Sequence, residues 1–136
     1  MCVTMLSVVT ILTCIFVSTH QISQIKPALR ELATSDPKDC LTFEIDGNDT
    51  CWLQIMGLHL NAAYPRDTTP DLLLLELADA GWISGVLSWE AKKYVTFVVS
   101  DWDLNELADW IDIYFVKILG CPDSSYELNV TWERLG

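Results

Sequence analysis

His59 is the residue whose type best suits a general base, because a histidine side chain gains and loses a proton near neutral pH. The other histidine, His20, falls at the end of the apolar N-terminal run. His59 lies between Leu58 and Leu60 in a strand-like stretch, and no glycine-flanked serine near it forms a nucleophile elbow. The sequence therefore favours a structural histidine, and we predict no catalytic residue.

Paired carboxylates offer a second chemistry, because glycosidases use two acidic side chains as acid and base. Asp101 with Asp103, and Asp109 with Asp112, are close enough in sequence for such a role. A chain with 19 acidic residues contains such pairs by chance, however, and a solvated acidic face is the simpler interpretation. We predict that the protein is not an enzyme.

A short polar run imitates the first ligands of a calcium-binding loop. Asp46, Asn48 and Thr50 have the alternate spacing of the first three ligands. Cys51 stands where such a loop needs glycine, and no glutamate closes it. The sequence also lacks the CxxC pair that is typical of zinc sites. We predict no metal and no cofactor.

Residues 1–19 form an apolar run without Lys, Arg, Asp or Glu, and the chain becomes polar at His20. This pattern is typical of a secretory signal peptide, with Val17 and Thr19 at the small-residue positions before a cut near His20. The alternative is a retained anchor, because the run is roughly as long as the shortest membrane-spanning helix. We predict cleavage, a secreted product and no stable membrane anchor afterwards.

The charge of the chain is strongly acidic, with 8 basic and 19 acidic residues and a net charge of −11. Such a charge disfavours nucleic acid and anionic membrane surfaces as partners, because their phosphates repel carboxylates. It suits a basic extracellular protein, whose approach the negative field would speed. The alternative is that the charge only keeps a secreted protein soluble.

Cysteine usage follows from the predicted cleavage, since Cys2 and Cys14 would leave with the signal peptide. Cys40, Cys51 and Cys121 would then remain in an oxidising compartment, where disulfides form. The candidate bridges are Cys51 to Cys121 and Cys40 to Cys121. A bridge from Cys40 to Cys51 is less favoured, because the segment between them has the pattern of a hairpin. One thiol is left over, and it is either buried or joins two chains in a disulfide-linked dimer.

Two sequons for N-glycosylation are present, Asn48-Asp49-Thr50 and Asn129-Val130-Thr131. Asn48 follows a turn-forming Asp-Gly pair, and Asn129 falls on the polar side of an alternating strand. Both asparagines are predicted to face water and to carry glycans.

Tryptophan is abundant, with six in the chain, all of them beyond the signal peptide. Trp102 and Trp110 flank an acidic crossing that contains Asp101, Asp103 and Asp109. Tryptophan is enriched in binding hot spots and stacks on sugars. These five residues form the predicted partner-contact surface. The other tryptophans lie in predicted strands and are assigned to the core.

Two hairpins are predicted from alternating apolar and polar residues. Residues 41–45 and 51–55 flank an Asp-Gly turn. Residues 82–89 and 94–100 flank the turn at 90–93.

The domain organisation follows from where these patterns start. Residues 1–19 are the signal peptide, residues 20–39 are predicted to be a flexible polar leader, and residues 40–136 form a single β-sandwich domain.

Two further segments carry conflicting patterns. Residues 71–80 include four consecutive leucines, which also suit a strand that is buried on both faces. Thr69 and Pro70 before them are typical of a helix start, and we predict a helix. Residues 111–119 are rich in β-branched and aromatic residues, and we predict a strand that pairs with residues 126–132.

The segment before that strand begins with residues that are typical of a helix N-terminus. Asp103 and Glu106 have the spacing of a capping box, and residues 104–109 are predicted to form a short helical crossing. The alternative is one helix over residues 104–119 that ends at Gly120. Its apolar face would consist of Leu104, Leu107, Ala108, Ile111, Phe115 and Ile118.

The C-terminal part of the chain resembles the last three strands of an immunoglobulin-like domain. The resemblance rests on a strand at 94–100, the crossing with Asp109, a strand with Tyr114 and the final strand at 126–132. Val116 stands where the family's inter-sheet cysteine would follow that tyrosine. The resemblance implies an all-β, mainly antiparallel fold, an immunoglobulin-like or related β-sandwich with one or two short helices, and a role in adhesion or receptor-like recognition.

Together these patterns predict a secreted acidic glycoprotein that binds an extracellular protein, such as a receptor, cytokine or immune ligand, with immune modulation as one use. The alternative is a carbohydrate-binding module that stacks sugars on exposed tryptophan.

Overall fold

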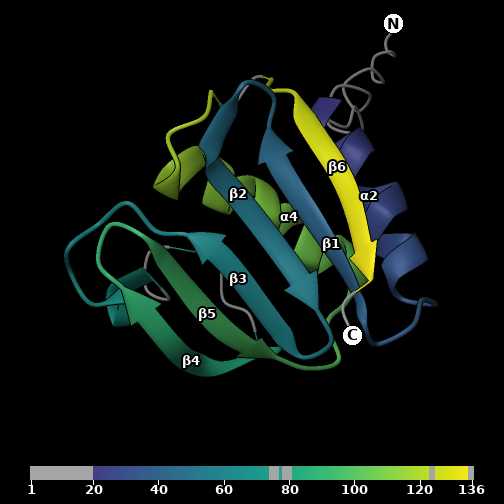
Figure 1. Ribbon diagram of the computed structural model, residues 1–136, viewed down its shortest axis with the longest axis horizontal. Coiled ribbons are helices and arrows are strands. Elements are labelled where there is room, and N and C mark those ends of the chain that lie inside the picture. Colours follow the sequence, from purple (N-terminus) through teal and green to yellow (C-terminus); the bar gives the residue numbers. More distant parts are fainter. Residues whose placement is uncertain (1–19, 74–76, 78–80, 123–124, 135–136) are drawn as a thin grey trace, which may run out of the picture.

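Six antiparallel strands form one sheet in the order β4-β5-β3-β2-β1-β6 (Figure 1). The computed structural model describes residues 20–134 apart from 74–76, 78–80 and 123–124. The elements, in chain order, are α2 (His20–Leu32), β1 (Asp39–Ile45), β2 (Asn48–Met56), β3 (His59–Ala63), the 3₁₀ turn η1 (Pro70–Leu72), β4 (Ile83–Glu90), β5 (Tyr94–Val99), α4 (Leu104–Ile113), the π-helical turn η2 (Tyr114–Ile118) and β6 (Leu128–Arg134).

Both predicted hairpins are confirmed. Strands β1 and β2 pair across Asp46 and Gly47, and Gly47 has a positive φ of 80° that favours glycine. Strands β4 and β5 pair from Glu90 opposite Tyr94 onward. In each case short-range alternation and turn chemistry are enough to specify the pairing.

The predicted strand at residues 111–119 is wrong, because the chain stays helical there through α4 and η2. The helix begins as expected: the Asp103 carboxylate accepts hydrogen bonds from the backbone N–H groups of Asn105 and Glu106 at 3.0 and 3.1 Å. Leu107, Ala108, Ile111, Phe115 and Ile118 form a continuous buried face. Packing of that face overrides the local preference of the segment for strand.

The strand predicted at 126–132 is observed as β6, but its partner is β1 rather than residues 111–119. Phe43 lies opposite Val130 and Thr42 opposite Thr131. The last strand therefore returns to the first strand of the sheet and forms one of its edges.

The predicted flexible leader is also wrong for residues 20–32, which form helix α2 beside β6 (Figure 1). Ile22, Ile25 and Leu29 follow helical spacing, and Ile25 and Leu29 are fully buried. The helix contacts β1, β6 and α4. The polar composition of the segment hid this narrow apolar stripe.

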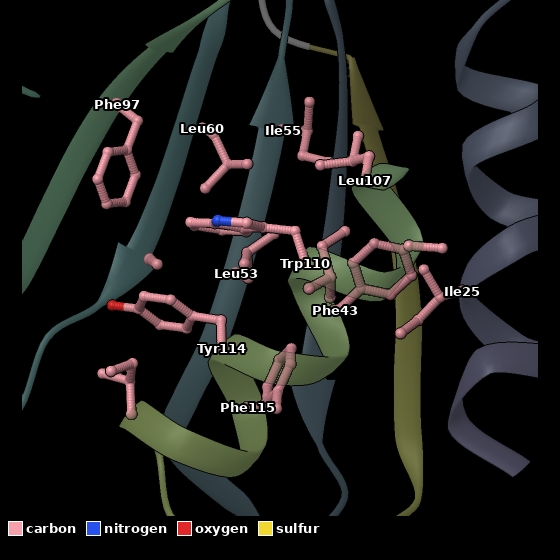
Figure 2. Packing of buried hydrophobic residues seen from close by; sticks show 14 of the residues in the cluster. Ile25, Phe43, Leu53, Ile55, Leu60, Phe97, Leu107, Trp110, Tyr114 and Phe115 are labelled. Carbon is pink, nitrogen blue, oxygen red and sulfur yellow. The ribbon is translucent and has the colours of Figure 1, made fainter. Parts of the chain in front are cut away.

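The core fills the space between one face of the sheet and the helices (Figure 2). Trp110 of α4 is at its centre, with its ring centroid 5.6 Å from that of Phe97 and 5.4 Å from that of Tyr114. The Tyr114 hydroxyl donates a hydrogen bond to the carbonyl oxygen of Ala63 at 2.7 Å, which ties the helical layer to β3. The sheet side chains in the same cluster include Phe43, Leu53, Ile55 and Leu60.

Two predictions fall partly or wholly outside the described residues. Within the predicted helix at 71–80 the structure shows η1, with Thr69 capping the N–H of Asp71 as expected, but residues 74–76 and 78–80 lie outside the described part. The predicted signal peptide at 1–19 also lies outside it.

The fold is mainly antiparallel β with two helices. The immunoglobulin-like sandwich stays a prediction, because the described strands all pair into one sheet and the layer packed on it is helical.

Candidate functional site

The predicted partner-contact surface is not assembled as expected, because Trp110 is only 2% exposed and belongs to the core. Trp102 is half-buried against that core, and Asp103 is engaged as the cap of α4. Asp101 and Asp109 are exposed. The prediction that two tryptophans frame an accessible acidic patch is therefore wrong for Trp110, whose indole fills the space under the sheet.

A different surface is available on the other side of the sheet. Side chains alternate between the two faces of a strand, so the residues between the core positions point away from α2 and α4. Figure 1 shows the described helices on one side of the strands, with α4 behind β1 and β2. We call the opposite side the open face.

A row of neutral polar side chains crosses the middle of the open face, with one residue from each strand. In sheet order these are Ser88, Thr96, Asn61, Gln54, Thr42 and Thr131, and each is the register partner of the next. The Thr96 hydroxyl donates a hydrogen bond to Oδ1 of Asn61 at 2.5 Å. Thr96 is only 8% exposed, but the other five residues are half-buried or exposed. Their hydroxyl and amide groups both donate and accept hydrogen bonds, so they can meet either kind of group on a partner.

A second row beside it combines aromatic rings with carboxylates. Trp52 and Tyr94 are half-buried and lie on either side of Ala63. Glu44 is the register partner of Trp52, and Glu90 is the register partner of Tyr94. We call Trp52, Tyr94, Glu44 and Glu90 the aromatic row.

A groove of about 560 Å³ opens at the end of the aromatic row. Trp52 and Ala63 line it from the sheet, and Lys92 and Lys93 line it from the β4–β5 turn. Trp52 is half-buried, whereas Ala63 is only 4% exposed.

The open face has an acidic character. Glu44, Glu90 and Glu133 fall on it by register, whereas the strands contain no lysine and Arg134 falls on the helix side.

The two lysines at the end of the open face are already paired. The ammonium group of Lys92 is 3.6 Å from a carboxylate oxygen of Asp67, and that of Lys93 is 2.9 Å from one of Glu90. The Lys93 pKa is raised by this hydrogen bond with Glu90. Lys93 thus neutralises Glu90, and Glu44 and Glu133 are the open-face carboxylates outside these two pairs.

Both sequon asparagines are exposed and lie at one corner of the sheet. Asn48 and Asn129 line the same shallow groove of about 320 Å³, together with Glu44 and Gly47. The side-chain amide of Asn129 donates to a carboxylate oxygen of Asp46 at 3.2 Å. Asn129 is the register partner of Glu44, and Asn48 also lines the groove beside Trp52, so glycans on these residues would border one end of the open face.

The three cysteines predicted to survive cleavage are free thiols in the structure. Cys40 and Cys51 are buried and Cys121 is half-buried. Burial raises the pKa of the Cys40 thiol, and the register places Cys40 opposite Glu133 on the open-face side of the sheet.

His59 is exposed at the start of β3. Across the described residues, histidine, cysteine and carboxylate side chains form no group of three that could hold a metal ion. No helix in the described part of the chain is both long and apolar enough to cross a membrane.

The sequence shows the polar residues of the open face strand by strand, but it does not show that they line up. Thr42, Gln54, Asn61 and Thr96 each occupy the polar positions of an alternating strand. Only the pairing of the strands shows that they form one row.

Comparison with known proteins identifies no family: no family model, no curated protein and no solved structure matches this chain.

Proposed function

We propose that this chain is a secreted acidic glycoprotein that binds a basic extracellular protein through the open face of its sheet. The observation that carries the proposal is a sheet face without a described helix over it, on which a polar row runs beside Trp52, Tyr94 and their neighbouring carboxylates.

The aromatic row supports the proposal through its geometry. Tryptophan and tyrosine provide large, rigid contact area at a low cost in conformational entropy, and they dominate binding hot spots. Trp52 and Tyr94 are half-buried, so neighbouring strands already hold their rings in place while part of each ring stays accessible.

The choice of a basic partner rests on charge complementarity. Glu44, Glu90 and Glu133 lie on the open face, and the whole chain has a net charge of −11. Carboxylates at the rim of an interface speed association with a positive surface and fix its orientation. A receptor, cytokine or immune ligand with a basic patch fits these requirements, and immune modulation is one use of such binding.

The test is capture of extracellular proteins on the immobilised secreted chain at low and raised salt. We expect a captured partner whose binding weakens as salt rises, and we expect Trp52→Ala and Tyr94→Ala each to weaken it at least tenfold. Trp132→Ala is the matched control, because Trp132 is also partly exposed but falls on the helix side at the sheet edge. Equal loss in the control and in Trp52→Ala would contradict binding through the open face.

One observation favours the carbohydrate-binding alternative, although not at its predicted residues. Trp52 lies beside a row of hydroxyl and amide groups, and this combination suits sugar recognition by stacking and hydrogen bonding. Saturable binding on a glycan array that is lost in both Trp52→Ala and Gln54→Ala would favour a sugar over a protein partner.

The finer fold prediction belongs with this proposal. An immunoglobulin-like sandwich would suit receptor-like recognition, and an experimental structure of the secreted protein would test it. A second sheet packed on the one described here would support that relation, and its absence from the complete secreted protein would contradict it.

A further inference from the structure

Cys51 lies next to the loop that contains Cys121. The Cys51 sulfur is 4.0 Å from the backbone carbonyl oxygen of Leu119, only two residues before Cys121. The chain turns at Gly120, which has a positive φ of 80°, and the N–H of Cys121 donates to the carbonyl oxygen of Phe115 at 2.9 Å. These contacts hold the second thiol close to the first part of β2.

The surroundings of the two thiols also overlap. Cys51 belongs to the hydrophobic core cluster, and Cys121 packs against that cluster. Burial, followed by the nearby Cys51 and Asp112, raises the pKa of Cys121 to about 11.

Cys40 is far from this pair. Leu41 lies opposite Ile55, so Cys40 is level with Met56, and Cys51 is five residues further along β2. At a rise of about 3.3 Å per residue this separates the two cysteines by roughly 17 Å. A disulfide needs its two Cα atoms within about 7 Å. Cys40 also lies on the opposite side of the sheet.

We propose that Cys51 and Cys121 form an intramolecular disulfide when the protein meets an oxidant, and that Cys40 is left as a buried thiol. The sequence leaves two candidate bridges, Cys51 to Cys121 and Cys40 to Cys121, and this proposal selects the first. It would fasten the start of β2 to the segment between η2 and β6. It also argues against a disulfide-linked dimer, because the spare thiol is only 4% exposed.

The oxidant is a small disulfide such as oxidised glutathione. The thiolate of one cysteine attacks a sulfur of that disulfide, and one glutathione thiolate leaves. The second cysteine thiolate then attacks the mixed disulfide on the protein sulfur, and the second glutathione thiolate leaves. Two cysteines are oxidised, one glutathione disulfide is reduced, and the two cysteine protons end on the two glutathione thiols.

The test uses the chain from His20 onward, purified with its thiols reduced and then equilibrated with oxidised glutathione at pH 8.5. The product is alkylated in denaturant, digested without reductant and mapped by mass spectrometry. We expect one peptide pair linked through Cys51 and Cys121, and Cys40 alkylated in full. Links that include Cys40, alkylation of all three cysteines, or a dimer that reductant separates would each overturn the proposal.

Variants sharpen this assignment. Cys40→Ser is the matched control and keeps the linked pair, whereas Cys51→Ser and Cys121→Ser each lose it. The wild-type map alone tests the proposal if a variant fails to fold. The result is independent of the proposed function, because partner capture and disulfide mapping measure different properties.

Discussion

The hydroxyl of Tyr126 donates a hydrogen bond to Oδ1 of Asp112 at 2.7 Å, and the same oxygen accepts a hydrogen bond from Nε2 of Gln21 at 3.1 Å. Asp112 thereby joins α4 to α2 and to the segment that leads into β6. Gln21 is fully buried, so it has no water to replace a lost partner. This carboxylate holds together parts of the chain that are far apart in sequence.

Replacement of Asp112 by alanine is expected to destabilise the protein. The change leaves the Tyr126 hydroxyl and the Gln21 amide without their acceptor, which costs roughly 1–3 kcal/mol. The free energy of unfolding in urea measures the effect. Asp109→Ala is the control, since Asp109 is exposed on the same helix. A loss in Asp112→Ala no larger than in the control would contradict a structural role for these hydrogen bonds.

The free energy of unfolding is expected to fall at alkaline pH because two tyrosines, Tyr114 and Tyr126, are buried. Burial is the main cause that raises the pKa of Tyr114 and of Tyr126, and Asp112 raises that of Tyr126 further. Their stabilisation is fully present below the unfolded pKa of about 10, because both states are then neutral. It is lost as pH rises above that value, because the unfolded chain releases these protons more readily.

The measurement is the melting temperature between pH 8 and pH 11 for the wild type and for Tyr126→Phe. The variant should lose less stability than the wild type across this range. Identical slopes for the wild type and Tyr126→Phe would show that Tyr126 does not set the alkaline limit.

Helix α2 is expected to contribute to stability as part of the core. Leu29 is fully buried, and Leu29→Ala should cost roughly 2–5 kcal/mol through lost contacts and a cavity. Arg30→Ala, at the exposed neighbouring position, should change the free energy of unfolding by less than about 0.5 kcal/mol. Equal and negligible effects of both changes would support the predicted flexible leader instead.

Trp110 is expected to behave as a core residue in mutagenesis. Trp110→Ala should cost roughly 3–5 kcal/mol, because the indole contacts Phe97, Tyr114 and Trp82. Trp102→Ala, at the half-buried position, should cost less. Denaturation monitored by circular dichroism compares them, and a Trp110→Ala protein of wild-type stability would argue for the surface position instead.

Both sequons are expected to carry glycans in the secreted protein. Asn48→Gln and Asn129→Gln should each remove one glycan, and the double variant should run at the mass of the enzymatically deglycosylated wild type. Electrophoresis before and after glycan removal measures this. Unchanged mobility of the wild type after that treatment would contradict both glycosylation and passage through the secretory pathway.

Local features of this fold can be read directly from the chain. The two hairpins depend on alternation and on turns such as Asp46-Gly47, and the start of α4 depends on the Asp103 cap. Each involves residues within a few positions of one another, so the same interactions act in the isolated segment and in the folded protein.

Other features depend on contacts between distant segments. Residues 111–119 have the composition of a strand, yet they are helical because Ile111 and Phe115 fill the core under the sheet. The pairing of β6 with β1, which completes the polar row, requires elements separated by many residues to meet. The contact of Cys51 with the carbonyl oxygen of Leu119, near Cys121, requires the same. Local preference amounts to a fraction of a kcal/mol per residue, whereas burial of a large apolar side chain contributes about 1.5–3 kcal/mol. Packing therefore overrode the local strand preference of residues 111–119. Strand register, which no single segment carries, created the surface proposed to bind a partner.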